Sequence, residues 1–122
     1  MATLEHVAIT STAETFPKII AFYEKVFGMK EIRKGNNLVF VSDGQGGRIE
    51  ILMSGLPALP APSHLAFVVP FNEFDAMVKT VREAGVKVDE PMTTPAGDRL
   101  CFFDDPAGNR AQVVGRLNPM PK

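Results

Sequence analysis

The chain carries an internal repeat, and this repeat limits the folds that are open to it. A strand-like segment that starts at His6 is followed by a helical stretch and then by Gly28. The same order returns from His64 to Gly85, and the histidine and glycine are 22 residues apart in the first copy and 21 in the second. Each copy of such a repeat is one supersecondary unit that needs a neighbour to complete its core, so we expect two similar modules.

A proline-rich segment separates the two copies. Three prolines fall within residues 55–62, where neither a helix interior nor a central strand would tolerate them. We interpret this segment as a linker between module 1, at about 4–54, and module 2, at about 63–116. Together the modules make one domain of ordinary size. The tail at 118–122 contains two more prolines and is predicted to be mobile.

Each copy combines one amphipathic helix with several short strands. Apolar residues recur at spacings of three and four between Phe16 and Phe27, and again between Phe74 and Val81. Short β-like runs follow each helix and are separated by turn residues. These runs are 38–41 and 48–53 in the first copy and 100–104 and 111–114 in the second, with weaker strands expected around Ile32 and Val88. The order predicts an α+β fold in which two βαβββ modules form a curved mixed sheet around a cleft.

The two histidines of the chain occupy matching places in the repeat. His6 and His64 each stand on the opening strand of a copy, and each is followed two residues later by an alanine. Alternate residues of a strand share a face, so each alanine leaves room beside an imidazole. Glu50 lies between two isoleucines of a later strand, and Gln112 holds the corresponding place in the second copy. If the modules pair about a pseudo-twofold axis, these four side chains converge.

Such a set of side chains predicts a metal centre. Two neutral imidazoles and one carboxylate suit Zn, Ni, Fe, Co or Mn, and Gln112 could add its amide oxygen as a neutral fourth ligand. Open coordination positions would remain for water or substrate. We therefore predict a divalent metal held by His6, Glu50, His64 and Gln112.

Simpler interpretations exist for each residue taken alone. A histidine on a strand is more often a satisfied core or surface residue, and Glu50 could be an edge-strand charge that opposes aggregation. Arg99 could belong to a solvated turn and Phe102 to the core. Arg99 is nevertheless a candidate for binding an anionic substrate group, because loops beside a cleft carry such contacts, and Phe102 is a candidate for lining the cleft. The matching positions of the histidines in the repeat favour the metal.

Composition narrows the choice of partner and compartment. Thirteen basic and 14 acidic side chains give a net charge of −1, so neither nucleic acid nor an anionic membrane is expected as the main partner. No apolar run approaches the roughly 18 residues of a spanning helix, and residues 1–5 lack the order of a secretion signal. The single cysteine, Cys101, cannot form an internal disulfide, which favours the cytoplasm. A small-molecule substrate is the expected partner.

Several motifs together resemble the vicinal oxygen chelate superfamily, which includes glyoxalase I, methylmalonyl-CoA epimerase, extradiol dioxygenases and bleomycin-resistance proteins. They are His6–Ile9, Phe22–Met29, Arg48–Ile51, Ser63–Phe67 and Phe102–Asn109, and the resemblance extends from His6 to about Arg116. It implies a single glyoxalase-like domain over the whole chain. It also implies metal ligands at His6, Glu50, His64 and Gln112, and assembly as a homodimer.

The resemblance implies a metal-dependent enzyme of the isomerase, lyase or dioxygenase type that acts on a small oxygenated substrate. The metalloenzymes of the family generally carry glutamate where this chain has Gln112, and in glyoxalase-type isomerases that residue is implicated in proton transfer. An amide cannot act as a base near neutral pH, so this role falls to Glu50 or to water on the metal. The substitution argues against glyoxalase I activity. The alternative is a non-catalytic binding or drug-sequestering protein of the bleomycin-resistance type.

Overall fold

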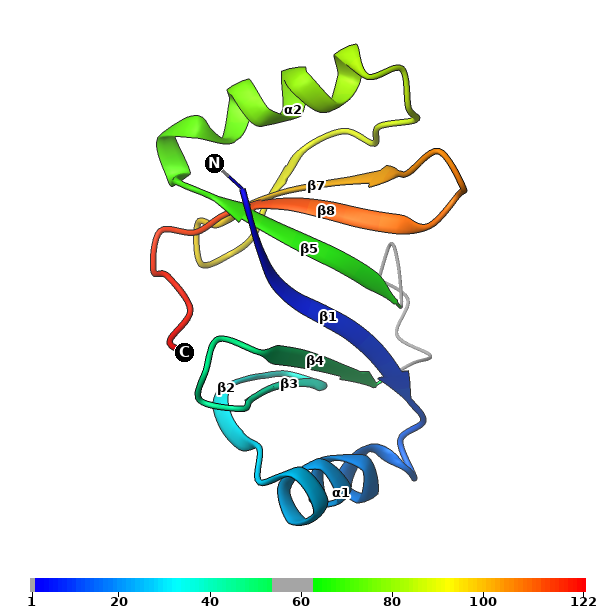
Figure 1. Cartoon of the computed structure of the whole chain (residues 1–122), viewed down its shortest axis with the longest axis vertical. Helices are drawn as coiled ribbons and strands as arrows, with labels where there is room; N and C mark the ends of the chain where they lie inside the picture. The colour runs from blue at the N-terminus through cyan, green and yellow to red at the C-terminus, as the bar shows by residue number, and fades with distance from the viewer. Residues whose placement is uncertain (1, 54–62) are drawn as a thin grey trace. The chain divides into compact units, whose positions relative to one another are not determined.

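The computed structural model describes residues 2–53 and 63–122, which fall into two structural units (Figure 1). The N-terminal unit holds residues 5–53 together with 63 and 120–122. The C-terminal unit holds residues 2–4 and 64–119. The expected linker at 55–62 lies outside the described residues, so its boundaries stay predictions.

The N-terminal unit has the predicted order of strand, helix and three strands. Its strands lie in the order β2-β3-β4-β1, in which β1 and β4 are parallel and the other neighbours are antiparallel. The weak strand expected around Ile32 is present as β2. The elements are β1 (Thr3–Ser11), α1 (Phe16–Phe27), β2 (Lys30–Gly35), β3 (Leu38–Ser42) and β4 (Arg48–Met53).

The C-terminal unit repeats this arrangement with the strand order β5-β8-β7-β6. Strands β5 and β8 are parallel, and β7 is antiparallel to both β8 and β6. A short 3-10 helix, η1, precedes the second α-helix. The elements are β5 (His64–Val69), η1 (Phe71–Glu73), α2 (Phe74–Glu83), β6 (Met92–Thr93), β7 (Arg99–Asp104) and β8 (Arg110–Gly115).

One strand differs from its predicted position. The weak strand expected around Val88 is reduced to a single bridge between Val88 and Phe103, and the strand that pairs with β7 is the two-residue β6 further along the chain. Pro91 lies between them and has no N–H to donate to a ladder, which explains the interruption. The α+β class and the mixed parallel and antiparallel pairing are as predicted.

A helix covers one face of the strands in each unit (Figure 1). In the N-terminal unit, residues of α1 pack on buried Val39, Val41 and Ile51. In the C-terminal unit, Phe74 and Val78 of α2 pack on Cys101 and Val113. The residues that alternate with these on each strand point to the other face, and that face carries the polar side chains described below.

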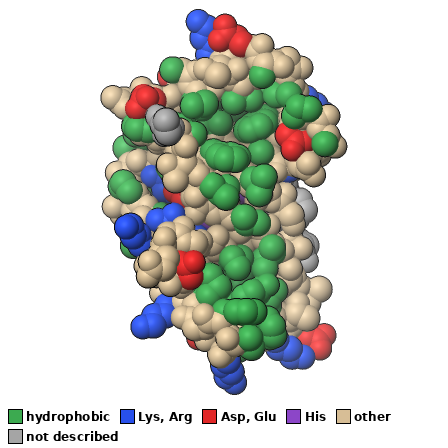
Figure 2. All heavy atoms as spheres, in the orientation of Figure 1, with side chains coloured by type: hydrophobic (Ala, Val, Ile, Leu, Met, Phe, Trp, Pro, Cys, Tyr) green, Lys and Arg blue, Asp and Glu red, His purple; other side chains and the backbone are tan. Residues whose placement is uncertain are grey.

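Helix α1 leaves part of its apolar surface exposed. Phe22, Val26 and Phe27 are 50%, 58% and 65% exposed, and the rings of Phe22 and Phe27 lie 6.1 Å apart. Figure 2 shows hydrophobic side chains at the surface of both units. Within the described part of the chain, neither helix has the length and apolar character needed to cross a membrane.

Candidate functional site

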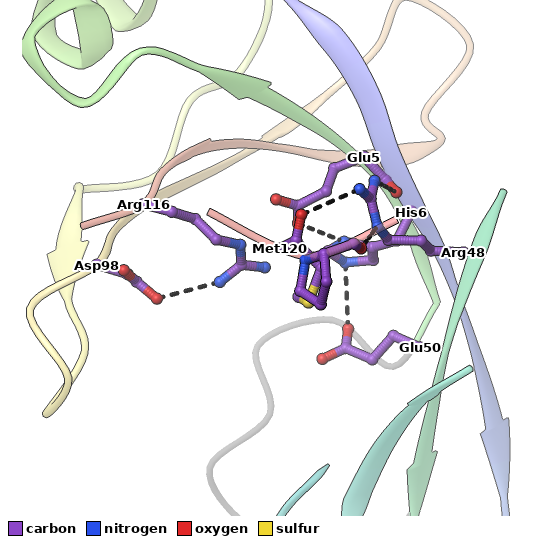
Figure 3. A network of polar contacts seen from close by, with 8 residues as sticks. Glu5, His6, Arg48, Glu50, Asp98, Arg116 and Met120 are labelled. Atoms are coloured by element: carbon purple, nitrogen blue, oxygen red, sulfur yellow. Dashed lines mark hydrogen bonds and ion pairs between the residues drawn. The ribbon is translucent and has the colours of Figure 1, made fainter. Parts of the chain in front are cut away.

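In the N-terminal unit, strand pairing places Glu50 close to His6. Glu50 of β4 is directly opposite Ala8 of β1 on one side and Phe40 of β3 on the other. His6 lies two residues before Ala8 and therefore shares its face. Both side chains are buried, and His6 Nε2 lies 3.4 Å from Glu50 Oε1 (Figure 3). The ring of His6 also meets that of Phe40 edge-on, with centroids 5.0 Å apart.

The other nitrogen of His6 contacts a second carboxylate. His6 Nδ1 lies 2.8 Å from Oε1 of Glu5, which is only 2% exposed (Figure 3). Burial favours the neutral imidazole, but the hydrogen bonds with Glu5 and Glu50 outweigh burial and raise the pKa of His6 above its ordinary value. The imidazole of His6 is thus held between two acidic groups within one unit.

Arg48 joins the start of β4 to the last residues of the chain. Its Nη1 donates to the backbone oxygen of Glu5 at 3.1 Å, its Nε to that of Pro121 at 2.8 Å and its Nη2 to that of Met120 at 3.2 Å (Figure 3). The Met120 side chain is buried. The tail that was expected to be mobile is thus held at Met120 and Pro121, because Arg48 supplies donors for backbone carbonyls that would otherwise need water.

The C-terminal unit repeats the arrangement around its own histidine. Gln112 of β8 is opposite Ala66 of β5 on one side and Phe102 of β7 on the other. His64 lies two residues before Ala66, and its ring meets Phe102 edge-on with centroids 5.2 Å apart. His64, Gln112 and Phe102 are all buried. Each unit thus places a histidine, an alanine, a Glu or Gln and a phenylalanine in the same register.

A family model describes this chain over residues 3–113, under the description Glyoxalase/Bleomycin resistance protein/Dioxygenase superfamily. The chain belongs to this superfamily. The match covers both copies of the repeat and both histidine strands, as the sequence motifs predicted.

Solved structures show the same fold at low identity. Methylmalonyl-CoA epimerase from Mycobacterium tuberculosis is 19% identical with a TM-score of 0.75, covering 94% of this chain and 88% of that one. A hypothetical protein from Bacillus halodurans C-125 is 18% identical with a TM-score of 0.76, covering 99% of each chain. A methylmalonyl-CoA epimerase variant from Streptomyces coelicolor, in complex with 2-nitronate-propionyl-CoA, is 19% identical with a TM-score of 0.72, covering 100% of this chain and 99% of that one.

The donors of this glyoxalase-superfamily chain fit a divalent metal. At metal–ligand distances of about 2.0–2.2 Å, two ligand atoms on one ion lie about 3.0–3.4 Å apart. The 3.4 Å between His6 Nε2 and Glu50 Oε1 agrees with that separation. His64 of the C-terminal unit is a second buried imidazole, and imidazoles and carboxylates are donor types that divalent metals accept.

The two predicted substrate-binding residues lie on opposite faces of β7. Phe102 shares the face of Gln112 and touches His64. Arg99 lies on the helix-covered face instead, with its guanidinium carbon 4.7 Å from the centre of the Phe74 ring and Nη1 3.6 Å from Asp75 Oδ1. The structure therefore does not bring Arg99 together with Phe102. This separation was predictable from the sequence, because residues three apart on a strand point to opposite faces.

Sequence reasoning did not identify a cation on the Gln112 face. Arg110 lies with its guanidinium carbon 5.4 Å from the centre of the Phe102 ring and donates to Asp104 at 3.2 Å and to Asp89. The hydrogen bond with Asp89 is the main reason why the pKa of Arg110 is raised. Two carboxylates thus balance this charge beside Phe102.

Proposed function

We propose that the protein is a metalloenzyme in which His6, Glu50, His64 and Gln112 hold one divalent metal ion. One observation carries the proposal: within each unit a buried histidine stands two residues before an alanine that is paired with Glu50 or Gln112. Because the two copies of the repeat fold alike, metal-binding side chains at matching positions have similar surroundings. Membership of a superfamily with metalloenzymes supports this proposal.

The proposed reaction is a proton transfer of the isomerase or lyase type. The substrate would be a small molecule with two neighbouring oxygen atoms, one of them a carbonyl. Two of the three structural neighbours described above are methylmalonyl-CoA epimerases, so acyl-CoA thioesters belong among the compounds to be tested. When bound, the metal would supply Lewis-acid stabilisation of negative charge on a substrate oxygen.

The roles of the side chains follow from their chemistry. Glu50 is the carboxylate of the proposed set and would accept the proton at a carboxylate oxygen. Gln112 is neutral and cannot take a proton near neutral pH, so its role is binding. Phe40 and Phe102 lie edge-on to the two imidazoles and would keep water away from them. Phe102 therefore remains a proposed substrate contact, whereas the position of Arg99 does not support that role.

Metal analysis of purified, untagged protein tests the metal centre. The native protein is expected to bind one ion per chain, and His6→Ala and His64→Ala are each expected to lose it. Val7→Ala, which alters an exposed residue of the same strand, is the matched control and should keep the metal. Full metal content in the His6→Ala/His64→Ala double variant would disprove the proposed centre.

Solvent-exchange measurements test the reaction. Metal-loaded protein in deuterium oxide is expected to exchange the hydrogen next to a substrate carbonyl, as followed by NMR over a panel of hydroxy ketones and acyl-CoA thioesters. Glu50→Gln should abolish exchange, whereas Glu31→Gln on the exposed edge strand β2 should not. Consumption of dioxygen with Fe(II) would favour the dioxygenase type. Tight ligand binding with neither metal nor turnover would favour the sequestering type.

We also propose that the protein is a cytoplasmic homodimer. The exposed apolar residues of α1 support an association between copies, because exposed clusters of this kind are common at protein contacts. Light scattering coupled to size-exclusion chromatography is expected to give twice the mass of the chain. A monomer at all concentrations would contradict this assembly.

A further inference from the structure

Glu5 is a buried acidic residue that the proposed reaction does not use. It is 2% exposed and lies directly before His6 on β1. Neighbouring residues of a strand normally point to opposite faces, yet the Glu5 carboxylate reaches the imidazole next to it. A buried carboxylate is costly unless its oxygen atoms are hydrogen-bonded, so this contact requires a reason.

We propose that Glu5 is a positioning residue that fixes the orientation and tautomer of His6 for metal binding. The inference rests on the metal centre proposed above. An ionised Glu5 carboxylate only accepts hydrogen bonds, so across the 2.8 Å contact it would be paired with a proton on His6 Nδ1. The neutral ring then has its lone pair on Nε2, which is the nitrogen that faces Glu50 at 3.4 Å.

The backbone around Glu5 is held in place as well. Arg48 Nη1 donates to the backbone oxygen of Glu5 at 3.1 Å, and the same guanidinium binds the carbonyls of Met120 and Pro121 (Figure 3). Arg48 thus ties the start of β1 to β4, the strand that carries Glu50. A carboxylate that holds the second nitrogen of a metal-binding histidine raises the basicity of the ligand and fixes its ring.

The repeat is unequal at this position. Ser63, which is exposed, precedes His64 and has no carboxylate to offer its imidazole. The carboxylate contact of 2.8 Å made by Glu5 is therefore not repeated by the residue that precedes the second histidine.

The first test is the tautomer of His6 in metal-free, full-length protein. Long-range nitrogen–hydrogen NMR at pH 8.5 should show the proton on Nδ1 in the native chain. In Glu5→Ala the ring should shift towards a mixture of tautomers. A proton on Nε2 in the native protein would overturn the positioning role, whether or not metal binds.

The second test is the affinity for Zn²⁺, measured by competition with a chelating dye. Loss of such an outer carboxylate lowers metal affinity by about 10–100-fold, and we expect this loss in Glu5→Ala. The visible spectrum of the Co²⁺-loaded protein should change as well. Glu31→Ala, which removes an exposed carboxylate on β2, should change neither quantity.

The outcomes distinguish a failure of the proposed Glu5 role from a failure of the proposed metal centre. Glu5→Gln keeps the shape of the side chain and remains informative if circular dichroism shows that Glu5→Ala does not fold. Unchanged Zn²⁺ affinity and Co²⁺ spectrum in both variants would refute the role of Glu5 while leaving the metal centre intact. A native chain that keeps the Nδ1 proton but binds no metal would refute the metal centre, and with it the ligand role of His6.

Discussion

Gln112 is the residue on which the proposed chemistry most depends. It is 4% exposed and stands in the second unit where Glu50 stands in the first, so the repeat offers one carboxylate and one amide at equivalent positions. A neutral amide leaves more positive charge on a bound metal than a second carboxylate would. The same amide cannot serve as a second base, which leaves proton transfer to Glu50 in the proposed reaction.

Replacing Gln112 by glutamate tests this assignment. A buried carboxylate without metal is unfavourable, so Gln112→Glu should lower the melting temperature of the metal-free protein. Added Zn²⁺ should restore the melting temperature, and isomerisation of a hemithioacetal should rise above the native rate. Both are measurable by scanning calorimetry and by absorbance. A variant that neither binds metal nor responds to it would show that this side chain is not a ligand.

Some residue positions were predictable and others were not. The closeness of His6 and Glu50 follows from strand parity and from the repeat, both of which are visible in the sequence. The contact of Glu5 with His6 was not predictable, because the same parity rule assigns neighbouring residues to opposite faces. The hydrogen bonds of Arg48 with Met120 and Pro121 join residues that are distant in the chain, and no local pattern indicates them.

At the scale of elements, the two units use the same tight turn before their last strand. Asp43 Oδ1 accepts the backbone N–H groups of Gln45 and Gly47, and Asp105 Oδ1 accepts those of Ala107 and Asn109. Each aspartate thus closes a loop that leads into β4 or β8. These turns set where the strands begin, and therefore which face receives Glu50 or Gln112.

The turn at Asp105 predicts a pH effect. The hydrogen bond from the Asn109 side chain, together with backbone N–H groups, holds the pKa of Asp105 below its ordinary value of 3.8. Its stabilising contribution is therefore fully present above pH 3.8 and is lost as the pH falls through the lowered pKa. Carboxyl-carbon NMR should give a midpoint below 3.8, and Asn109→Ala should raise that midpoint.

The matched control for this titration is Asn36→Ala, which alters an exposed asparagine in another turn. It should leave the midpoint of Asp105 unchanged. A native midpoint at or above 3.8 would contradict the turn geometry. Hydrogen bonds of this exposed kind are expected to affect titration more than global stability.

The elements themselves were largely predictable from periodicity and turn residues. The helices α1 and α2 and the strands β3, β4, β7 and β8 lie close to their expected ranges. The position of β6 was missed because Pro91 interrupts the segment between Val88 and Met92. Within this segment the two-residue β6 pairs only with β7. Short edge segments of this kind have too few apolar contacts to leave a pattern in the sequence.

At the scale of the whole chain, each described end segment belongs to the unit that is formed mainly by the other copy of the repeat. Residues 2–4 belong with the second copy of the repeat, and residues 120–122 belong with the first. The return of the tail to the first copy could not be predicted. It depends on hydrogen bonds from Arg48 of β4, which is more than 70 residues from the tail in the sequence.

Removing residues 120–122 should destabilise the first copy. Met120 is 8% exposed, and burial of a methionine contributes about 1.5–3 kcal/mol, so we expect a loss of this size in urea denaturation. Removing Lys122 alone is the control and should have little effect, because its side chain is exposed. Equal stability of both truncated proteins would show that the tail does not contribute to the fold.

The exchange of the end segments also bears on any attempt to make a half-length version of this fold. A fragment of residues 5–53 alone would lack the two backbone carbonyls that accept hydrogen bonds from the Arg48 guanidinium. A designer would have to graft a short peptide in the place of Met120 and Pro121, or replace Arg48 with a smaller neutral residue. A single cut between the copies of the repeat therefore does not give an intact half.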